Sequence, residues 1–326
     1  MAGTGNEPEF SRGATNEGDI VKRRVGIIGM GWVGASVAIS TLHSGITDQL
    51  LLHDLRADRA EGEAMDLAHG GPFYPSATVR VGTIEEMVDA DAVVVTAGHG
   101  GGPGQSRLEL LRENAAVIEQ LGQQLTRCRG TIIVVTNPVD VLTRLMKKAS
   151  GLPSARVLGT GTMLDSARLR ASLSKTLEID AHSIHAYVVG EHGDSEVVLW
   201  SGARAGGVRL RDWPGWKNER ETRIAHEVQR AAYEIIQRKG ATNHAIGLAT
   251  ADLLRCILRG ERRILTVSRV QEGAFGVSDI ALSLPTVVGT EGATRIIEPE
   301  ISADERSALQ HSAEVLREAG RQVGLE

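Results

Sequence analysis

The stretch RVGIIGMGWVG, residues 24–34, decides the fold of this chain. Its first five residues form a short apolar run typical of a buried strand, and three glycines follow ahead of a segment with helical character. In such a strand–turn–helix unit Gly29 makes the tight turn, Gly31 lets a pyrophosphate approach the backbone, and Gly34 allows close helix–strand packing. The free N–H groups at the helix N-terminus attract phosphate. The stretch therefore predicts a dinucleotide-binding unit.

A second apolar run, residues 49–53, ends at Asp54, twenty residues after Gly34. A carboxylate at that distance accepts hydrogen bonds from the adenosine ribose and repels a 2′-phosphate, so Asp54 favours NAD over NADP. Arg56 weakens this preference slightly. The alternative is a doubly wound domain that binds no dinucleotide.

Strand-like runs continue to alternate with helical stretches along the first half, at residues 77–82, 92–98, 131–137 and 156–161. This alternation predicts an α/β fold with a Rossmann-type, doubly wound parallel sheet, whose ligands bind at the carboxyl ends of the strands. The pattern of the second half predicts an α+β substrate domain. We therefore expect three parts: a flexible N-terminal tail (1–20), an NAD-binding domain (21–160) and a catalytic domain (161–326).

Composition argues against several classes of partner. The 326 residues carry a net charge of −5, so no general basic field favours nucleic acid or an anionic membrane. No apolar run approaches the roughly 18 residues of a membrane span, and residues 1–20 lack the apolar core of a signal peptide. The isolated cysteines, Cys128 and Cys256, favour a reducing, cytoplasmic location. No histidine has metal-ligand spacing, so no metal is expected.

The segment GEHGDS, residues 190–195, places one histidine in a glycine-rich turn after an apolar run, residues 184–189, that predicts a buried strand. Flanking glycines let the backbone turn sharply so that the imidazole of His192 can project into a cleft. Histidine titrates near neutral pH and can both give and take a proton. The alternative is a surface or core histidine without a chemical role.

Two further features, the pair Asp165 and Arg168 and the segment 98–107, indicate a function only when they are considered together with the other motifs. Asp165 and Arg168 stand three residues apart and share one helix face, where such a pair is most often a weak surface ion pair. The glycine-rich segment 98–107 ends in Arg107 and has the composition of a lid that closes over a ligand. The alternative for that segment is a disordered hairpin with a solvated Arg107.

Taken together, these residues resemble the lactate and malate dehydrogenases, and within them the L-lactate dehydrogenase branch. The resemblance keeps family order from about Val21 to the C-terminus. Its motifs are GMGWVG (29–34), Asp54, DLAHG (66–70), the loop 98–107, TNPVD (136–140), LDSAR (164–168), GEHGDS (190–195) and KGAT (239–242).

The resemblance implies a role for each reacting group. His192 is the acid/base that protonates the keto oxygen of pyruvate, and Asp165 holds its imidazole in the right tautomer. Arg168 binds the substrate carboxylate as a two-pronged pair, and Arg107 polarises the carbonyl. Further substrate contacts are implied for Asn137, Thr242 and Gly101. Contacts with the NAD cofactor are implied for Gly29, Gly31, Trp32, Val33, Gly34, Asp54, Thr96, Ala97, Gly98, Asn114, Asn137 and Ile246.

The choice between malate and lactate as the preferred 2-hydroxy acid depends on whether the substrate pocket carries one extra positive charge. Where malate enzymes carry an arginine in the lid, and lactate enzymes usually a glutamine, this chain has Gly101. Gly101 offers no cation for a second carboxylate, and Glu191 stands where malate enzymes usually have glycine. We therefore expect an L-lactate dehydrogenase that also tolerates bulkier 2-keto acids. The alternatives are an NAD-dependent malate dehydrogenase and, more remotely, a catalytically silent NAD-binding protein.

The resemblance also implies a homo-oligomeric enzyme, with a tetramer expected and a dimer as the alternative, acting in glycolysis and fermentation. Arg170 and His185 match positions at which bacterial lactate dehydrogenases bind fructose 1,6-bisphosphate across a subunit interface. Relatives that lack this activation carry the same pair, so allosteric control rests on analogy alone.

Overall fold

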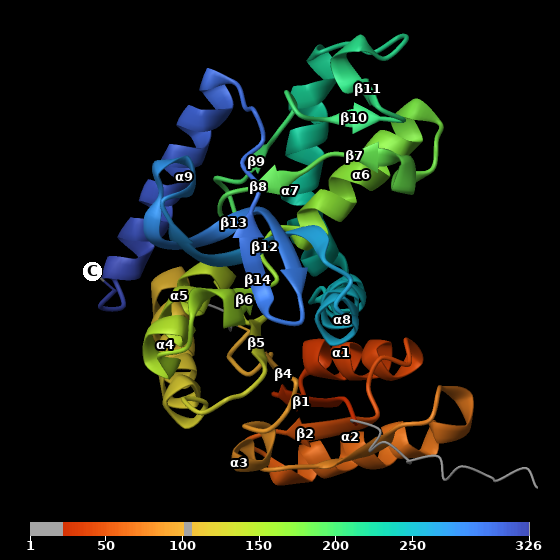
Figure 1. Ribbon diagram of the computed structural model, residues 1–326, viewed down its shortest axis with the longest axis vertical. Coiled ribbons are helices and arrows are strands. Elements are labelled where there is room, and N and C mark those ends of the chain that lie inside the picture. Colours follow the sequence, from red (N-terminus) through yellow and green to blue (C-terminus); the bar gives the residue numbers. More distant parts are fainter. Residues whose placement is uncertain (1–21, 101–105, 326) are drawn as a thin grey trace, which may run out of the picture.

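The part of the chain described by the computed structural model, residues 22–100 and 106–325, is built on a nine-stranded sheet (Figure 1). Six of its strands are parallel and stand in the order β3-β2-β1-β4-β5-β6. They are β1 (Arg24–Ile28), β2 (Gln49–His53), β3 (Thr78–Val81), β4 (Ala92–Val95), β5 (Thr131–Val134) and β6 (Val157–Gly159). This order reverses between β1 and β4, so the predicted doubly wound sheet is confirmed, with the switch point beside the glycine turn.

The second half of the chain extends the same sheet with three antiparallel strands. They are β12 (Arg263–Glu272), β13 (Ser278–Gly289) and β14 (Gly292–Ile296). β12 meets β6 through the pair Ser268 and Gly159. A β-carbon on Gly159 would lie 2.4 Å from Oγ1 of Thr143, so the side chains packed against this strand leave room for glycine only.

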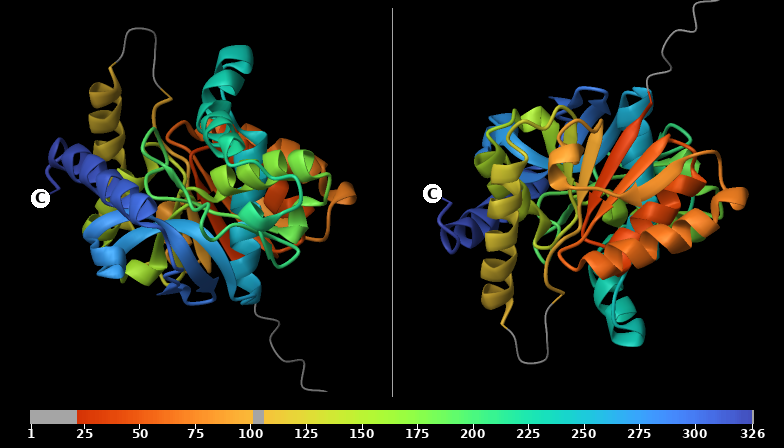
Figure 2. Two further views of the ribbon diagram at one scale, coloured as in Figure 1. Left: turned by 90° about the horizontal axis from the view of Figure 1, so that it is seen from above. Right: turned by 90° about the horizontal axis from the view of Figure 1, so that it is seen from below.

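Helices cover both faces of the sheet (Figures 1 and 2). One face packs on α1 (Trp32–His43), α2 (Ala57–His69) and α8 (His244–Arg259); the other packs on α3 (Ile84–Met87), α4 (Arg107–Gln124), α5 (Val139–Ser150) and α9 (Ala303–Arg321). Within β2, Leu50 and Leu52 pack in the core beneath α1, α2 and α8, and Leu51 packs in the core on the opposite face. Because alternate strand residues point to opposite faces, a strand covered on both sides is apolar throughout.

A third core lies above the sheet in Figure 1, where α6 (Met163–Leu177) packs on α7 (Glu219–Lys239). The remaining strands here are β7 (Ile184–His185), β8 (Val188–Val189), β9 (Val197–Val198), β10 (Arg204–Ala205) and β11 (Val208–Arg209). No helix within residues 22–100 and 106–325 is long and apolar enough to cross a membrane.

The single strand expected over residues 184–189 is wrong. The run divides into β7, which pairs with β10, and β8, which pairs with β9 in a different sheet. Ala186 between them is buried and Tyr187 is half-buried. The apolar run correctly indicated burial, but hydrophobicity carries no information about which strand supplies the hydrogen bonds.

Candidate active site

A cavity of about 440 Å³ lies where the carboxyl ends of β1, β4, β5 and β6 face α6, α7 and α8. One end is lined by the glycine turn around Gly31 and by Thr96 and Gly98 at the end of β4. The other end is lined by Arg168 and His192. The cavity therefore joins the glycine turn of the predicted dinucleotide site to the predicted reacting groups, although Gly31 and Arg168 are 137 residues apart in the sequence.

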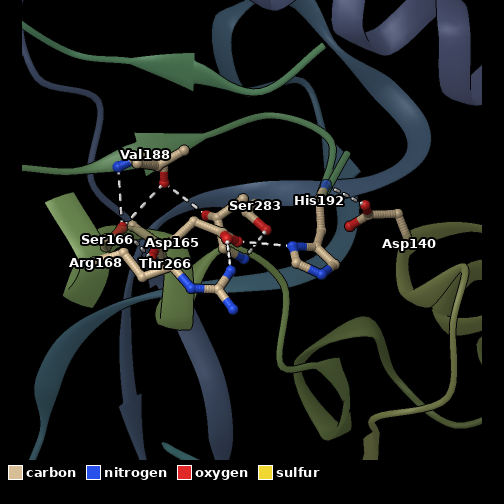
Figure 3. Close-up of polar contacts among 9 residues, drawn as sticks. Asp140, Asp165, Ser166, Arg168, Val188, His192, Thr266 and Ser283 are labelled. Atoms are coloured by element: carbon tan, nitrogen blue, oxygen red, sulfur yellow. Dashed lines mark hydrogen bonds and ion pairs between the residues drawn. The ribbon is translucent and has the colours of Figure 1, made fainter. Parts of the chain in front are cut away.

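Asp165 organises the reacting end of this cavity (Figure 3). Its Oδ2 lies 2.7 Å from Nδ1 of His192, and its Oδ1 accepts a hydrogen bond of 2.8 Å from Nη1 of Arg168. The Asp165 side chain is 4% exposed, Arg168 14% and His192 26%. An ionised carboxylate only accepts hydrogen bonds, so Nδ1 carries the proton and Nε2 is left for a ligand. The arrangement offers a proton donor and a guanidinium side by side.

Hydrogen bonds at the N-terminal turn of α6 fix the position of Asp165. Ser166, the next residue, accepts the backbone N–H of Val188 at 2.9 Å, and its hydroxyl lies 3.0 Å from that of Thr266 (Figure 3). Thr162 donates to the carbonyl of Val188. These buried bonds tie the first turn of α6 to β8 and β12. Asp165 and Arg168 then share one helix face because they are three residues apart.

A second carboxylate holds the backbone of the histidine. Oδ2 of Asp140, near the start of α5, accepts the N–H of His192 at 2.7 Å (Figure 3). Asp140 is buried, and burial raises its pKa to about 6. Sequence reasoning gave this residue no role, although its place just after the carboxyl end of β5, in the motif TNPVD, was a signal of a site residue.

The local charges set the proton affinity of His192. Burial alone would lower its pKa, but Asp165, followed by Asp140 and Glu196, raises it to about 9. Burial works against ionisation of Asp165 too, yet the charges of His192 and Arg168 lower its pKa. Burial also raises the pKa of Glu196 to about 8. The imidazole is therefore held in its protonated form at neutral pH, ready to donate.

The glycine turn fits a dinucleotide. Gly29 has φ of +100°, and a β-carbon on Gly34 would lie 1.9 Å from the carbonyl oxygen of Gly29. Among the described residues no side chain caps the N-terminus of α1, whose N-cap is Gly31, so its N–H groups are available to a phosphate. Asp54 accepts the backbone N–H of Met30 at 2.7 Å, which fixes its carboxylate beside the turn. Backbone room and anion-binding groups are both in place.

The ends of β4 and β5 are bound together behind the cavity. Thr96 donates to the carbonyl of Gly29, and the carbonyl of Ala97 accepts from Thr136. Asn114, wholly buried on α4, bonds both backbone groups of His99 and donates to the carbonyl of Asn137 at 2.9 Å. Asn114 and Ala97 therefore support the wall, whereas Thr96 and Asn137 line it.

The other predicted residues divide between the cavity and positions elsewhere. Trp32, Val33, Thr242 and Ile246 line the cavity. Arg107 is the first residue of α4, but its side chain and all of Gly101 lie outside the described residues. Cavity-lining residues that sequence reasoning did not single out include Leu164, Ala232, Ile236 and Ala241. Leu164 and Ala241 lie within the motifs LDSAR and KGAT, whereas the only sequence signal of Ala232 and Ile236 was helical apolar spacing, which core residues share.

Arg170 and His185 lie away from this cavity. Arg170 is half-buried on α6, and His185 is exposed on β7. His185 stands opposite Arg204 across the β7–β10 pair. No hydrogen bond or ion pair joins Arg170 to His185 in the described part of the chain.

Comparison with known proteins covers nearly the whole chain. Residues 23–159 match the lactate/malate dehydrogenase NAD binding domain, and residues 162–323 match the lactate/malate dehydrogenase alpha/beta C-terminal domain. An L-lactate dehydrogenase of Treponema denticola is 41% identical over 92% of this chain and 98% of its own length. One of Moorella thermoacetica is 43% identical over 93% of this chain and 98% of its own.

A solved structure agrees with these sequence matches. The minor L-lactate dehydrogenase of Enterococcus mundtii, in its ligands-bound form, superposes with a TM-score of 0.91 at 38% identity. The match covers 94% of this chain and 99% of that one.

Proposed function

This chain belongs to the lactate/malate dehydrogenase family, and we propose on that premise that it is an NAD-dependent L-lactate dehydrogenase, which reduces pyruvate or a related small 2-keto acid reversibly. The observation that carries this function is the placement of His192, Asp165 and Arg168 around one cavity that continues to the glycine turn. We also propose two domains, 21–160 and 161–326, and the separate family matches over residues 23–159 and 162–323 support this division.

Each side chain has one task in the reaction. Arg168 pairs with the substrate carboxylate, and His192 delivers the proton on Nε2 to the keto oxygen. Asp165 keeps the imidazole oriented and charged until the transfer. Bound NADH supplies the hydride that adds to C2 of the substrate. Arg107, by resemblance, polarises the carbonyl. In the reverse direction His192 removes the hydroxyl proton of lactate.

The cofactor is NAD, held by the groups that fit it here. The N-terminus of α1 takes the pyrophosphate, and Asp54 takes the ribose hydroxyls. Thr96, Gly98 and Asn137 line the stretch of cavity that leads to His192, where the nicotinamide belongs. Gly98 is required there, because a β-carbon would lie 2.4 Å from the Thr136 methyl group.

The experiment is a substrate panel. The loss of NADH absorbance is measured with pyruvate, 2-ketobutyrate and oxaloacetate for the wild type and for Gly101→Arg. We expect the wild type to prefer pyruvate, with 2-ketobutyrate accepted because small residues such as Ala232 and Ala241 line the cavity. Gly101→Arg should gain on oxaloacetate because it adds a cation for the second carboxylate. A wild-type preference for oxaloacetate would establish a malate dehydrogenase. Binding of NADH without turnover of any of these substrates would indicate a catalytically silent NAD-binding protein.

We propose a homo-oligomer, with a tetramer as the expected state. Three helices that cover one face of the sheet present large apolar side chains outward: Ile39 on α1, Met65 on α2 and Leu248 on α8, which are 47%, 61% and 64% exposed. Large apolar side chains exposed on helices that cover one face of the sheet support an interface between copies of this chain. Light scattering should give a mass above 34.8 kDa, and Leu248→Glu should lower it.

We also propose an allosteric site and a cellular location. Arg170 and His185, with Arg204 beside His185, would bind fructose 1,6-bisphosphate at a subunit interface. If millimolar fructose 1,6-bisphosphate changes neither activity nor assembly, this site is refuted. The free, buried Cys128 and Cys256 support a cytoplasmic location. A role in glycolysis or fermentation follows from the proposed reduction of pyruvate.

A further inference from the structure

The turn that carries His192 is held from outside by a residue more than a hundred positions away. The backbone N–H of Glu191, immediately before the histidine, donates to the hydroxyl of Ser312 on α9 at 2.7 Å. The hydroxyl of Ser195, three residues after the histidine, lies 3.2 Å from the same oxygen. One side chain therefore contacts the turn on both sides of His192.

The surroundings of Ser312 show that packing alone does not account for it. The buried face of α9 is otherwise apolar around this position, with Leu309, Ala313 and Leu316 in the core. Ser312 has no exposed surface, and a hydroxyl in such a place is costly unless it is hydrogen-bonded. Every hydrogen bond that this hydroxyl makes within the described residues goes to the turn.

The turn is shaped to receive the hydroxyl. Gly190 has φ of +86°, and a β-carbon there would lie 2.7 Å from Oγ of Ser312. Glu191 folds its carboxylate back onto the turn, where it accepts the backbone N–H of Ser195 at 3.1 Å and contacts the Ser195 hydroxyl. The turn is thus a compact unit whose outer surface is fitted to Ser312.

We propose that Ser312 is a positioning residue for the reaction: from the C-terminal helix, it fixes the turn so that the imidazole of His192 meets Asp165 and the substrate. Asp140 holds the backbone of the same histidine from α5, so the turn is fastened between two helices. The role is an alignment role, since Ser312 is not among the described residues that line the cavity and its hydrogen bonds reach the turn rather than the imidazole. A displacement of about 1 Å at a reacting group can reduce a rate 100-fold.

The test compares Ser312→Ala with Ala313→Gly. Ser312→Ala removes the hydroxyl but keeps the helix, and we expect kcat for pyruvate to fall about 10- to 100-fold while the Kd for NADH changes less than twofold. Ala313→Gly loosens the same turn of α9 without removing a bond to the catalytic turn. It should keep kcat within about twofold, with a Tm at least as low as that of Ser312→Ala.

A second readout is independent of turnover. This inference rests on the proposed function, so the His192 ring is also titrated by NMR in the protein without ligands. Ser312→Ala should lower the pKa of His192 from about 9, because a displaced ring loses its bond to Asp165, and Ala313→Gly should leave it unchanged. Absence of turnover in the wild type would contradict the dehydrogenase function alone.

Two results would overturn the role of Ser312. One is an unchanged kcat and His192 pKa in Ser312→Ala; the other is an equal loss in Ala313→Gly, which would make the effect one of stability. If Ser312→Ala cannot be purified in folded form, Ser195→Ala breaks one of the two contacts from the turn side. It must then reduce kcat in the same way, and normal activity in Ser195→Ala would overturn the inference.

Discussion

Oδ2 of Asp165 lies 2.7 Å from Nδ1 of His192, and this contact decides which ring nitrogen faces the cavity. The other oxygen of the same carboxylate holds Arg168 at 2.8 Å. A single buried side chain therefore orients both the proton donor and the group that grips the substrate. Because each partner depends on the same carboxylate, changes at any one of the three residues should affect the reaction in distinguishable ways.

Replacing Asp165 with Asn should shift the pH profile. Pyruvate reduction needs the protonated imidazole, so kcat/KM of the wild type should hold at neutral pH and fall as the pH rises through about 9. In Asp165→Asn the largest charge that raises the pKa of His192 is lost while burial remains, so this pKa falls from about 9 and the loss of activity begins at a lower pH. At pH 7 the loss should be at least about 100-fold.

The profile is measured from pH 5 to 10 with pyruvate and, in reverse, with lactate. Lactate oxidation needs the neutral imidazole, so its rate should rise with pH where pyruvate reduction falls. If the wild type and Asp165→Asn have the same pH profile of kcat/KM, Asp165 does not set the proton affinity of His192.

Replacing Arg168 with Lys should weaken substrate binding and leave the affinity for NADH unchanged. The guanidinium has a planar fork that matches a carboxylate, whereas an ammonium is a single point charge. We expect kcat/KM for pyruvate to fall about 100-fold, or ~2.7 kcal/mol, mostly through KM. Stopped-flow fluorescence should give an unchanged Kd for NADH. A KM equal to that of the wild type would remove Arg168 from the substrate site.

Asp140 should act through the backbone of His192 rather than through its ring. Asp140→Ala leaves the partly buried His192 N–H without its acceptor, at a cost of about 1–3 kcal/mol in the free energy of unfolding. Chemical denaturation measures this loss, and kcat for pyruvate should fall with it.

The matched variant for this position is Asp140→Asn, which keeps an oxygen acceptor but removes the charge. It should retain more stability and activity than Asp140→Ala, and it should lower the pKa of His192 because Asp140 contributes to raising it. Equal behaviour of the two variants would show that the acceptor is irrelevant.

Asp54 should govern the choice of cofactor. Asp54→Ser removes the carboxylate that accepts ribose hydroxyls and repels a 2′-phosphate, so the affinity for NADH should fall roughly tenfold and the preference over NADPH should narrow. Asp58→Ser, at an exposed site in the first turn of α2, is the control and should change neither. The measurement is the Kd for NADH and for NADPH in each variant. If Asp54→Ser leaves the ratio of the two Kd values unchanged, Asp54 does not determine the choice of cofactor.

Much of the fold and the site could be predicted because the signals are local. The spacing of Gly29, Gly31 and Gly34 specifies a turn within six residues, and the alternation of apolar strands and helices specifies a parallel sheet. The three-residue spacing of Asp165 and Arg168 already put both on one helix face. The sequence motif around His192 carried its chemistry, since imidazole is suited to proton transfer at neutral pH.

Tertiary structure alone decided how distant segments meet. It joined β12 to β6, divided the apolar run 184–189 between two sheets, and brought both Asp140 and Ser312 into contact with the histidine turn. The sequence by itself determined which residues can bind a phosphate, pair with a carboxylate or donate a proton, because those properties belong to side chains and short turns. Their alignment depends on packing between elements far apart in the chain, and no local spacing records it.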